Sequence, residues 1–178
     1  IYDVNDFNRF TLAWEEYVPM PFRHHAISVF VRGGYIDNNE IDDFFDLYLG
    51  SRDGLRGYTY YSLGGKRLAM GRIAYRFPIL RGIDRRLGVL HMSSLYGGLF
   101  AETGQAWDTG EPSWEKAKSD VGFELRLKGF SFYSYPLAAS FEAAYGLDDV
   151  TYTDPFNEEL VFYEGKKWKF YGSVLFGF

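Results

Sequence analysis

Apolar and polar side chains alternate with a period of two residues along several stretches of the chain, as they do in a strand with one face in apolar surroundings. The clearest case is the stretch 119–127, where Val121, Phe123, Leu125 and Leu127 alternate with polar residues or glycine. Further strands are expected at 8–18, 25–35, 68–78, 88–105, 133–145 and 168–178. The pattern predicts an all-β protein of about seven antiparallel strands, and no stretch has a convincing helical period.

The two faces of the last three expected strands differ in kind. One face is apolar and aromatic from end to end, and the other carries ions such as Glu124, Arg126, Glu142 and Lys169. Strands of soluble sandwiches are usually about five or six residues long, whereas strands that span a bilayer need about nine to eleven. The long alternating stretches therefore favour strands that face lipid on one side and water on the other.

Composition supports strands and excludes several classes of protein. Aromatic residues make up 20% of the chain, which also has 20 glycines and no cysteine, a profile that favours many strands joined by tight turns. No uninterrupted apolar run approaches the roughly 20 residues of a spanning helix, which excludes a helical membrane protein. The net charge of -5 argues against nucleic acid as a partner, because a phosphate-binding surface normally has a basic excess.

The stretch from about 36 to 66 loses the strand period, and a structureless segment of roughly thirty residues inside a compact domain is usually functional. It contains Leu55-Arg56-Gly57-Tyr58, in which an arginine stands between bulky apolar neighbours and several glycines lie nearby. Such a composition predicts a loop tip that is bound to another part of the protein and not exposed to water.

This tetrapeptide and the motifs that follow it resemble the C-terminal half of the BamA-type (bacterial surface antigen) barrels, which serve assembly and translocation at the outer membrane. The family signature in its inward-folded loop is an apolar residue, Arg, Gly and an aromatic residue, and Leu55, Arg56, Gly57 and Tyr58 match it. Phe100-Ala-Glu-Thr-Gly104 resembles the aromatic-x-acid-x-Gly pattern of the family. The alternating residues Trp168, Phe170, Val174, Phe176 and Phe178 resemble its C-terminal assembly signal.

The resemblance implies a partner for the loop arginine. In the family this arginine reaches into the lumen and pairs with acids on the two strands that follow, and the acid of the second strand corresponds to Glu102 here. The first-strand position that often carries Glu corresponds to Ala74. Removing one member of a buried ion pair costs about 3–5 kcal/mol, so an arginine in a confined lumen needs at least one carboxylate. We expect Arg56 to pair with Glu102, Gly57 to allow the close approach and Tyr58 to pack beside it.

The resemblance also implies a fold, a location and partners. Residues 1–178 are expected to be the C-terminal part of an antiparallel transmembrane β-barrel in the bacterial outer membrane, with a long loop at about 36–66 folded inward. An open sheet in lipid would leave strand edges unpaired, so the barrel is expected to be incomplete in this chain. The implied partners are outer-membrane lipid, N-terminal barrel strands, periplasmic modules, and client polypeptides or subunits of an assembly complex.

Three functions follow from these patterns. The first is insertion or translocation of polypeptides, in which the seam between the first and last strand opens and offers an edge for strand addition. The second is a passive pore or a membrane anchor for an N-terminal module. The third, a soluble lipocalin-type barrel, requires a closed sheet with an apolar interior, which the ionic face disfavours. The residues alone do not separate the first two.

The sequence shows no pattern of catalysis or metal binding. It has no Gly-x-Ser-x-Gly elbow to present a nucleophile, so we expect no enzyme and no cofactor. The pair His24-His25 has no third ligand at a suitable spacing. One acidic cluster lacks the spacing of a calcium loop and is interpreted as a solvated loop; it consists of Asp37, Glu40, Asp42, Asp43 and Asp46.

We expect the chain to need lipid or detergent to stay dispersed. The face that carries Phe123, Leu125, Phe141, Phe170 and Phe176 would otherwise be an apolar surface far larger than that of a soluble monomer. Size-exclusion chromatography with light scattering, in plain buffer and in detergent, measures this dependence. A monodisperse species in plain buffer would contradict the membrane interpretation.

Overall fold

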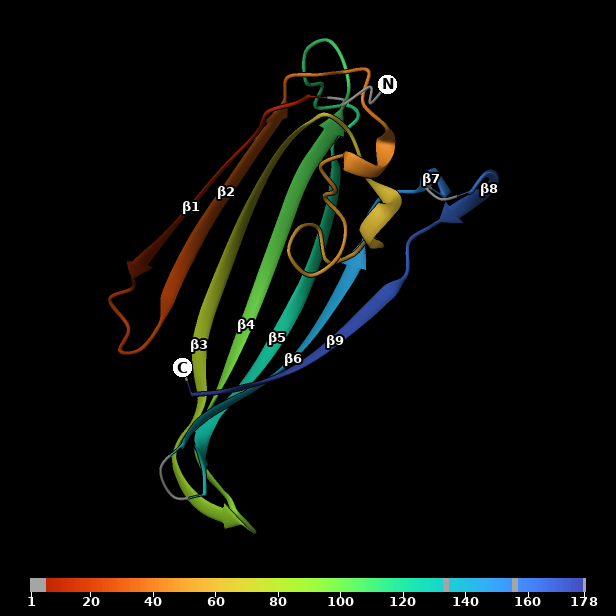
Figure 1. Cartoon of the computed structure of the whole chain (residues 1–178). Coiled ribbons are helices and arrows are strands. Elements are labelled where there is room, and N and C mark those ends of the chain that lie inside the picture. Colours follow the sequence, from red (N-terminus) through yellow and green to blue (C-terminus); the bar gives the residue numbers. More distant parts are fainter. Residues whose placement is uncertain (1–5, 133–134, 155–156, 178) are drawn as a thin grey trace.

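The computed structural model describes residues 6–132, 135–154 and 157–177. Its main element is an antiparallel seven-stranded sheet in the order β1-β2-β3-β4-β5-β6-β9 (Figure 1). The strands are β1 (Arg9–Pro19), β2 (Ala26–Ile36), β3 (Arg67–Leu87), β4 (Leu90–Trp107), β5 (Lys118–Ser131), β6 (Tyr135–Gly146) and β9 (Trp168–Phe176). The expected all-β antiparallel fold is confirmed. Within the described residues the sheet is open, with β1 and β9 as its edges.

Two strands lie where the sequence pattern indicated none. The strands β7 (Val150–Asp154) and β8 (Asn157–Glu164) form a separate antiparallel hairpin between β6 and β9. The helical elements among the described residues are two short 3-10 turns, Asp43–Phe45 and Tyr60–Ser62. Over the part of the chain that the structure describes, no helix is long and apolar enough to cross a membrane.

The strand β3 is 21 residues long and continues well past its expected end at 78. Its pairing with β4 shifts register between Pro78 and Leu80 and again between Arg81 and Arg85. Proline has no N–H to donate to the ladder, which accounts for the first irregularity. The sequence pattern faded here because bulges break a strict two-residue period. The pairing of β3 with β2 ends at Arg76, and beyond it β3 and β4, with β5 paired along β4, form an overhang at the lower end of Figure 1.

The sheet has an outer and an inner face, and it curves around the segment 37–66, here called the inner loop (Figure 1). The outer face is apolar and exposed, with Phe123, Phe141 and Phe170 in neighbouring strands at ring centroid distances of 6.2 and 6.0 Å. Phe170 is 64% exposed and Leu12, on the first strand, is 76% exposed. A contiguous apolar surface of this kind marks a face that contacts lipid or protein.

The buried core lies between the inner loop and the inner face of the sheet. Leu47, Leu49, Leu55 and Tyr58 of the loop are fully buried. They form one apolar cluster with Ile36, Ile41, Leu68, Met70 and Val150. The loop therefore supplies the second layer that an isolated sheet lacks, because a sheet buries a face only by packing another element against it.

The ring of Phe100 on β4 leaves no room for a side chain at Gly122 of β5. The side chain of Phe100 on β4 lies directly beside Gly122 of β5, its partner in the register. A Cβ at Gly122 would collide with the Phe100 ring and with the carbonyl of Ala143. In contrast, a Cβ at Gly71 of β3 would meet no atom within 4 Å.

We expect Gly122→Ala to destabilise the fold by about 1–3 kcal/mol, the usual cost of forcing an extra methyl into a packed site. Gly71→Ala is the matched control, and we expect it to be neutral or slightly stabilising, because a strand residue other than glycine loses less backbone entropy. Urea unfolding in detergent, followed by aromatic fluorescence, measures both variants. Equal effects at the two positions would contradict the close packing of Phe100 on Gly122.

Candidate functional site

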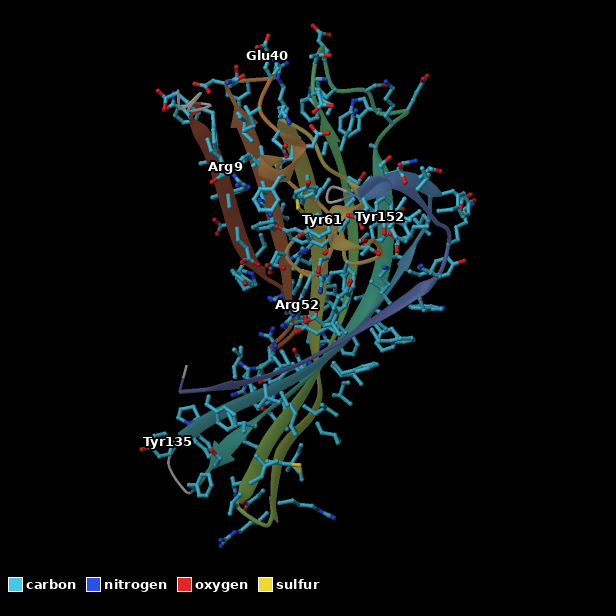
Figure 2. All side chains as sticks on the ribbon, turned by 45° about the vertical axis from the view of Figure 1, so that its right-hand side comes forward. Arg9, Glu40, Arg52, Tyr61, Tyr135 and Tyr152 are labelled. Carbon is cyan, nitrogen blue, oxygen red and sulfur yellow. The ribbon has the colours of Figure 1, made fainter. Side chains whose placement is uncertain are left out.

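The tip of the inner loop is a compact turn held by its own backbone. The N–H of Leu55 donates to the carbonyl of Leu49 at 2.6 Å, and the N–H of Ser51 donates to the carbonyl of Tyr58 at 2.8 Å. A Cβ at Gly54 would collide with the carbonyl of Leu49, so this approach needs a glycine. These contacts present the motif 55–58 to the sheet as a preformed unit. Figure 2 labels Arg52 near the lower end of the loop.

Arg56 is buried between carboxylates of two strands. Its Nη2 and Nε lie 2.8 and 2.9 Å from Oε1 of Glu102 on β4, and its Nη1 lies 2.7 Å from Oε2 of Glu142 on β6. Its backbone N–H also donates to Oε2 of Glu102 at 2.9 Å. The guanidinium lies over the ring of Phe100, with Cζ 3.6 Å from the centroid. The pair between Arg56 and Glu102 that the resemblance implied is therefore present.

The second carboxylate comes from a strand that sequence reasoning did not connect with the loop. The resemblance placed the second acid on the first strand after the loop, where this chain has Ala74. In the structure Glu142 takes that role, and Ala74 instead packs beside the Phe100 ring together with Ala144. The only sequence signal for Glu142 was its position on the ionic face of β6.

Gly57 lies so close to the sheet that a side chain would not fit. Its N–H donates to Oδ2 of Asp120 on β5 at 2.7 Å. A Cβ on Gly57 would lie 2.7 Å from the Cβ of Asp120 and 2.8 Å from the Cα of Gly146 on β6. Two glycines on facing segments therefore let the backbones of loop and sheet approach each other. The close approach expected of Gly57 is present, and Asp120 is a contact that sequence reasoning missed.

Tyr58 packs its ring into the core, and its hydroxyl group is hydrogen-bonded. The side chain is fully buried, and its hydroxyl donates to the carbonyl of Ser119 at 2.9 Å. The N–H of Asp148 donates to the same hydroxyl at 3.0 Å. Burial raises the pKa of Tyr58 to about 12, so the hydroxyl keeps its proton for the bond to Ser119.

Further cations complete the charge cluster under the loop. Arg72 on β3 forms an ion pair with Glu102, and Arg52 on the loop lies 2.9 Å from Glu142. With Arg56 and Asp120, the cluster holds three arginines and three carboxyl groups. Burying charges is costly unless each is paired and hydrogen-bonded, so the ion pairs of Arg56 with Glu102 and Glu142 favour one position of the loop over others. Neither Arg52 nor Arg72 was predicted from the sequence as part of the site.

A second anchor holds the loop at Thr59. Both its N–H and its hydroxyl donate to the carboxylate of Glu164, at 2.9 and 2.8 Å, and Lys169 of β9 forms an ion pair with the same carboxylate. Burial alone would raise the pKa of Glu164, but the bonds from Lys169 and Thr59 outweigh burial and lower it. Glu164 ends the hairpin β7-β8, so this hairpin and the last strand together fix the loop.

The acidic stretch at the start of the loop is more ordered than a solvated segment. Asp46 is buried and, like Asp43, pairs with the buried Lys66. Asp37 accepts bonds from the backbone and side chain of Asn8 at 2.8 and 2.7 Å. No group of three His, Asp or Glu residues in the described ranges is placed to hold a metal ion. The interpretation as a solvated loop is therefore wrong for Asp46.

The proposed C-terminal signal residues lie away from the charge cluster. Trp168, Phe170, Val174 and Phe176 occupy the outer face of β9 and are 50–64% exposed. Phe178 lies outside the described residues. The alternate residues of the same strand face inward, and among them Tyr171 donates its hydroxyl proton to the carbonyl of Arg56 at 2.7 Å. The strand β9 therefore contributes side chains to both the outer and the inner face of the sheet.

Comparison of this chain with protein-family models, with curated proteins and with solved structures finds no match. The arrangement holds the inner loop in one place against β3, β4, β5, β6 and β9.

We expect Arg56→Ala to destabilise the protein by about 3–5 kcal/mol, because Glu102 and Glu142 would lose the buried cation that they share. The cations that remain, Arg72 and Arg52, each pair with only one of the two carboxylates and are more exposed than Arg56. Arg52→Ala is the matched control. It also removes a partner of Glu142, but its side chain is 39% exposed and Arg56 remains, so we expect a loss below about 1 kcal/mol.

Denaturant unfolding in detergent measures both losses, and limited proteolysis of the segment 37–66 reports whether the loop is released. Glu102→Asp keeps the charge and is expected to be tolerated better than Glu102→Gln. Similar losses for Arg56→Ala and Arg52→Ala would count against the central role of Arg56.

Proposed function

We propose that this chain is the C-terminal part of a transmembrane β-barrel of the BamA type, integral to the bacterial outer membrane, that assists the insertion or translocation of polypeptides. The observation that carries the proposal is the inner loop, whose Arg56 is bound by Glu102 and Glu142 on the inner face of the sheet. The loop motif matches the family signature, and Arg56 also makes the contact with an inner-face carboxylate that the family implies.

The two faces of the sheet support a position in a membrane. An exposed apolar face suits hydrocarbon, and an ionic inner face suits a water-filled lumen. Because backbone groups in lipid must be paired, the edges β1 and β9 require additional strands to close the barrel. Those strands, and the modules attached to them, are the partners that the proposal needs.

The link between the inner loop and the edge strand supports a role in assembly over simple anchoring. Tyr171 and Lys169 of β9 donate hydrogen bonds to Arg56 and Thr59 of the loop. An edge strand offers unpaired backbone groups to an incoming strand of another polypeptide. A loop bound to that edge strand would hold it in position while its outer edge is engaged by a client.

A passive pore or a membrane anchor for an N-terminal module is the alternative. The observation in its favour is the ionic inner face, which extends beyond the loop to Arg76, Glu124 and Arg126. A pore needs such a lining and does not need a loop coupled to the last strand.

The test is to reconstitute the full-length protein in liposomes and add an unfolded outer-membrane barrel protein as client. We expect client insertion, measured by protease protection, to be faster than in empty liposomes and to slow when Arg56→Ala loosens the loop. Ion conductance is recorded on the same liposomes. Conductance without faster insertion would replace the assembly role by the pore.

A further inference from the structure

A second polar region lies on the inner face, toward the end of the sheet that carries the β1-β2 turn. It is a cavity of about 350 Å³ that no part of the inner loop lines. The residues that give it its character are Tyr17, Arg76, Tyr96, Glu124, Arg126 and Lys128. Five strands contribute to its lining, namely β1, β2, β3, β4 and β5.

The cavity has an excess of positive charge. Arg126 Nη2 lies 2.9 Å from Oε1 of Glu124, and Arg76 Nε lies 3.9 Å from Oε2 of the same residue. One carboxylate thus faces two arginines, and Lys128 adds a third cation.

Two of these cations lie over tyrosine rings, which do not neutralise their charge. Lys128 Nζ lies 5.3 Å from the ring centroid of Tyr96, and Arg76 Cζ lies 5.6 Å from that of Tyr17. Contacts of this kind are attractive but leave the full positive charge available to an anion. The rings also provide flat walls for an organic group attached to that anion.

The cavity contains a donor that the protein does not use. Arg76 Nε is buried and has no hydrogen-bond partner among the described residues. Buried polar atoms are normally satisfied, and one that is not points to a missing partner. Gly98 lies between Arg76 and Glu124 in the register and adds no side chain, which keeps the space between them open.

We propose that this cavity binds a phosphate group. Phosphate carries about -1.5 to -2 charges at neutral pH, which matches three cations offset by one carboxylate. Guanidinium groups bind its oxygens through paired donors, and Arg76 has a free one. The volume exceeds that of a phosphate ion alone, and the tyrosine walls fit the organic part of a phosphate monoester. The monoester is either a soluble molecule or the headgroup of a lipid, since the chemistry of recognition is the same.

The test uses the chain in a neutral detergent and titrates three probes by calorimetry. These are inorganic phosphate, glycerol 3-phosphate, and micelles doped with phosphatidic acid, with phosphatidylcholine-doped micelles as the blank. Saturable binding of the soluble probes identifies a soluble ligand, and binding of the doped micelles alone identifies a lipid headgroup. Failure of all three probes to bind overturns the proposal. It leaves the proposed assembly function untouched, because that function rests on the inner loop.

Three variants test whether the cavity is the site. We expect Arg126→Gln to weaken phosphate binding about tenfold, as for the loss of one charged hydrogen bond. Arg85→Gln changes the same charge on the exposed part of the overhang and should leave binding unchanged. Glu124→Gln removes the competing carboxylate and should strengthen binding several-fold.

Arg126→Gln is expected to weaken phosphate binding and Glu124→Gln to strengthen it. These opposite effects distinguish a change in binding from a loss of folding, because a variant that merely damages the structure cannot bind phosphate more tightly. Weaker binding by Glu124→Gln, or equal loss with Arg85→Gln and Arg126→Gln, would overturn the assignment.

Discussion

The position of the inner loop on the sheet depends on the buried cation Arg56. Arg56 joins β4 to β6 through Glu102 and Glu142, and it does so across the intervening strand β5, whose Asp120 takes the neighbouring N–H of Gly57. An arginine is suited to this position because its planar fork bonds two carboxylates at once and keeps its charge when buried. Without that contact the inner loop would pack on the sheet only through apolar side chains, which specify position poorly.

The two faces of the sheet differ in character because side chains alternate between them along each strand. Because side chains alternate across a strand, β5, β6 and β9 place apolar residues on the outer face and ionic residues such as Glu124, Glu142 and Lys169 on the inner face. On β9 this alternation places Phe170 outside and Tyr171 inside, one residue apart. The inner loop fills part of the inner side with apolar residues such as Leu49 and Leu55, so the protein has a core without a second sheet.

The alternating pattern predicted the seven strands of the sheet because each strand has one apolar and one polar face. It missed the hairpin β7-β8. There Val161, Tyr163 and the Phe162 between them are all exposed, so the hairpin shows no clean two-residue period. In the site, the motif 55–58 and Glu102 were accessible through resemblance. Glu142, Asp120 and Glu164 were not, because their roles depend on strand register and loop path, which no short motif encodes.

The bonds from the last strand to the inner loop have a consequence for the order of folding. Tyr171 is 115 residues from Arg56 in sequence, and Lys169 is 110 residues from Thr59. Contacts between residues so far apart form late, since the entropy of closing a long loop must be met first. A slip of β9 by two residues would move both donors by about 7 Å. The bonds of Arg56 and Thr59 to β9 therefore form only when the last strand has paired in this register, so they couple the position of the loop to the register of the last strand.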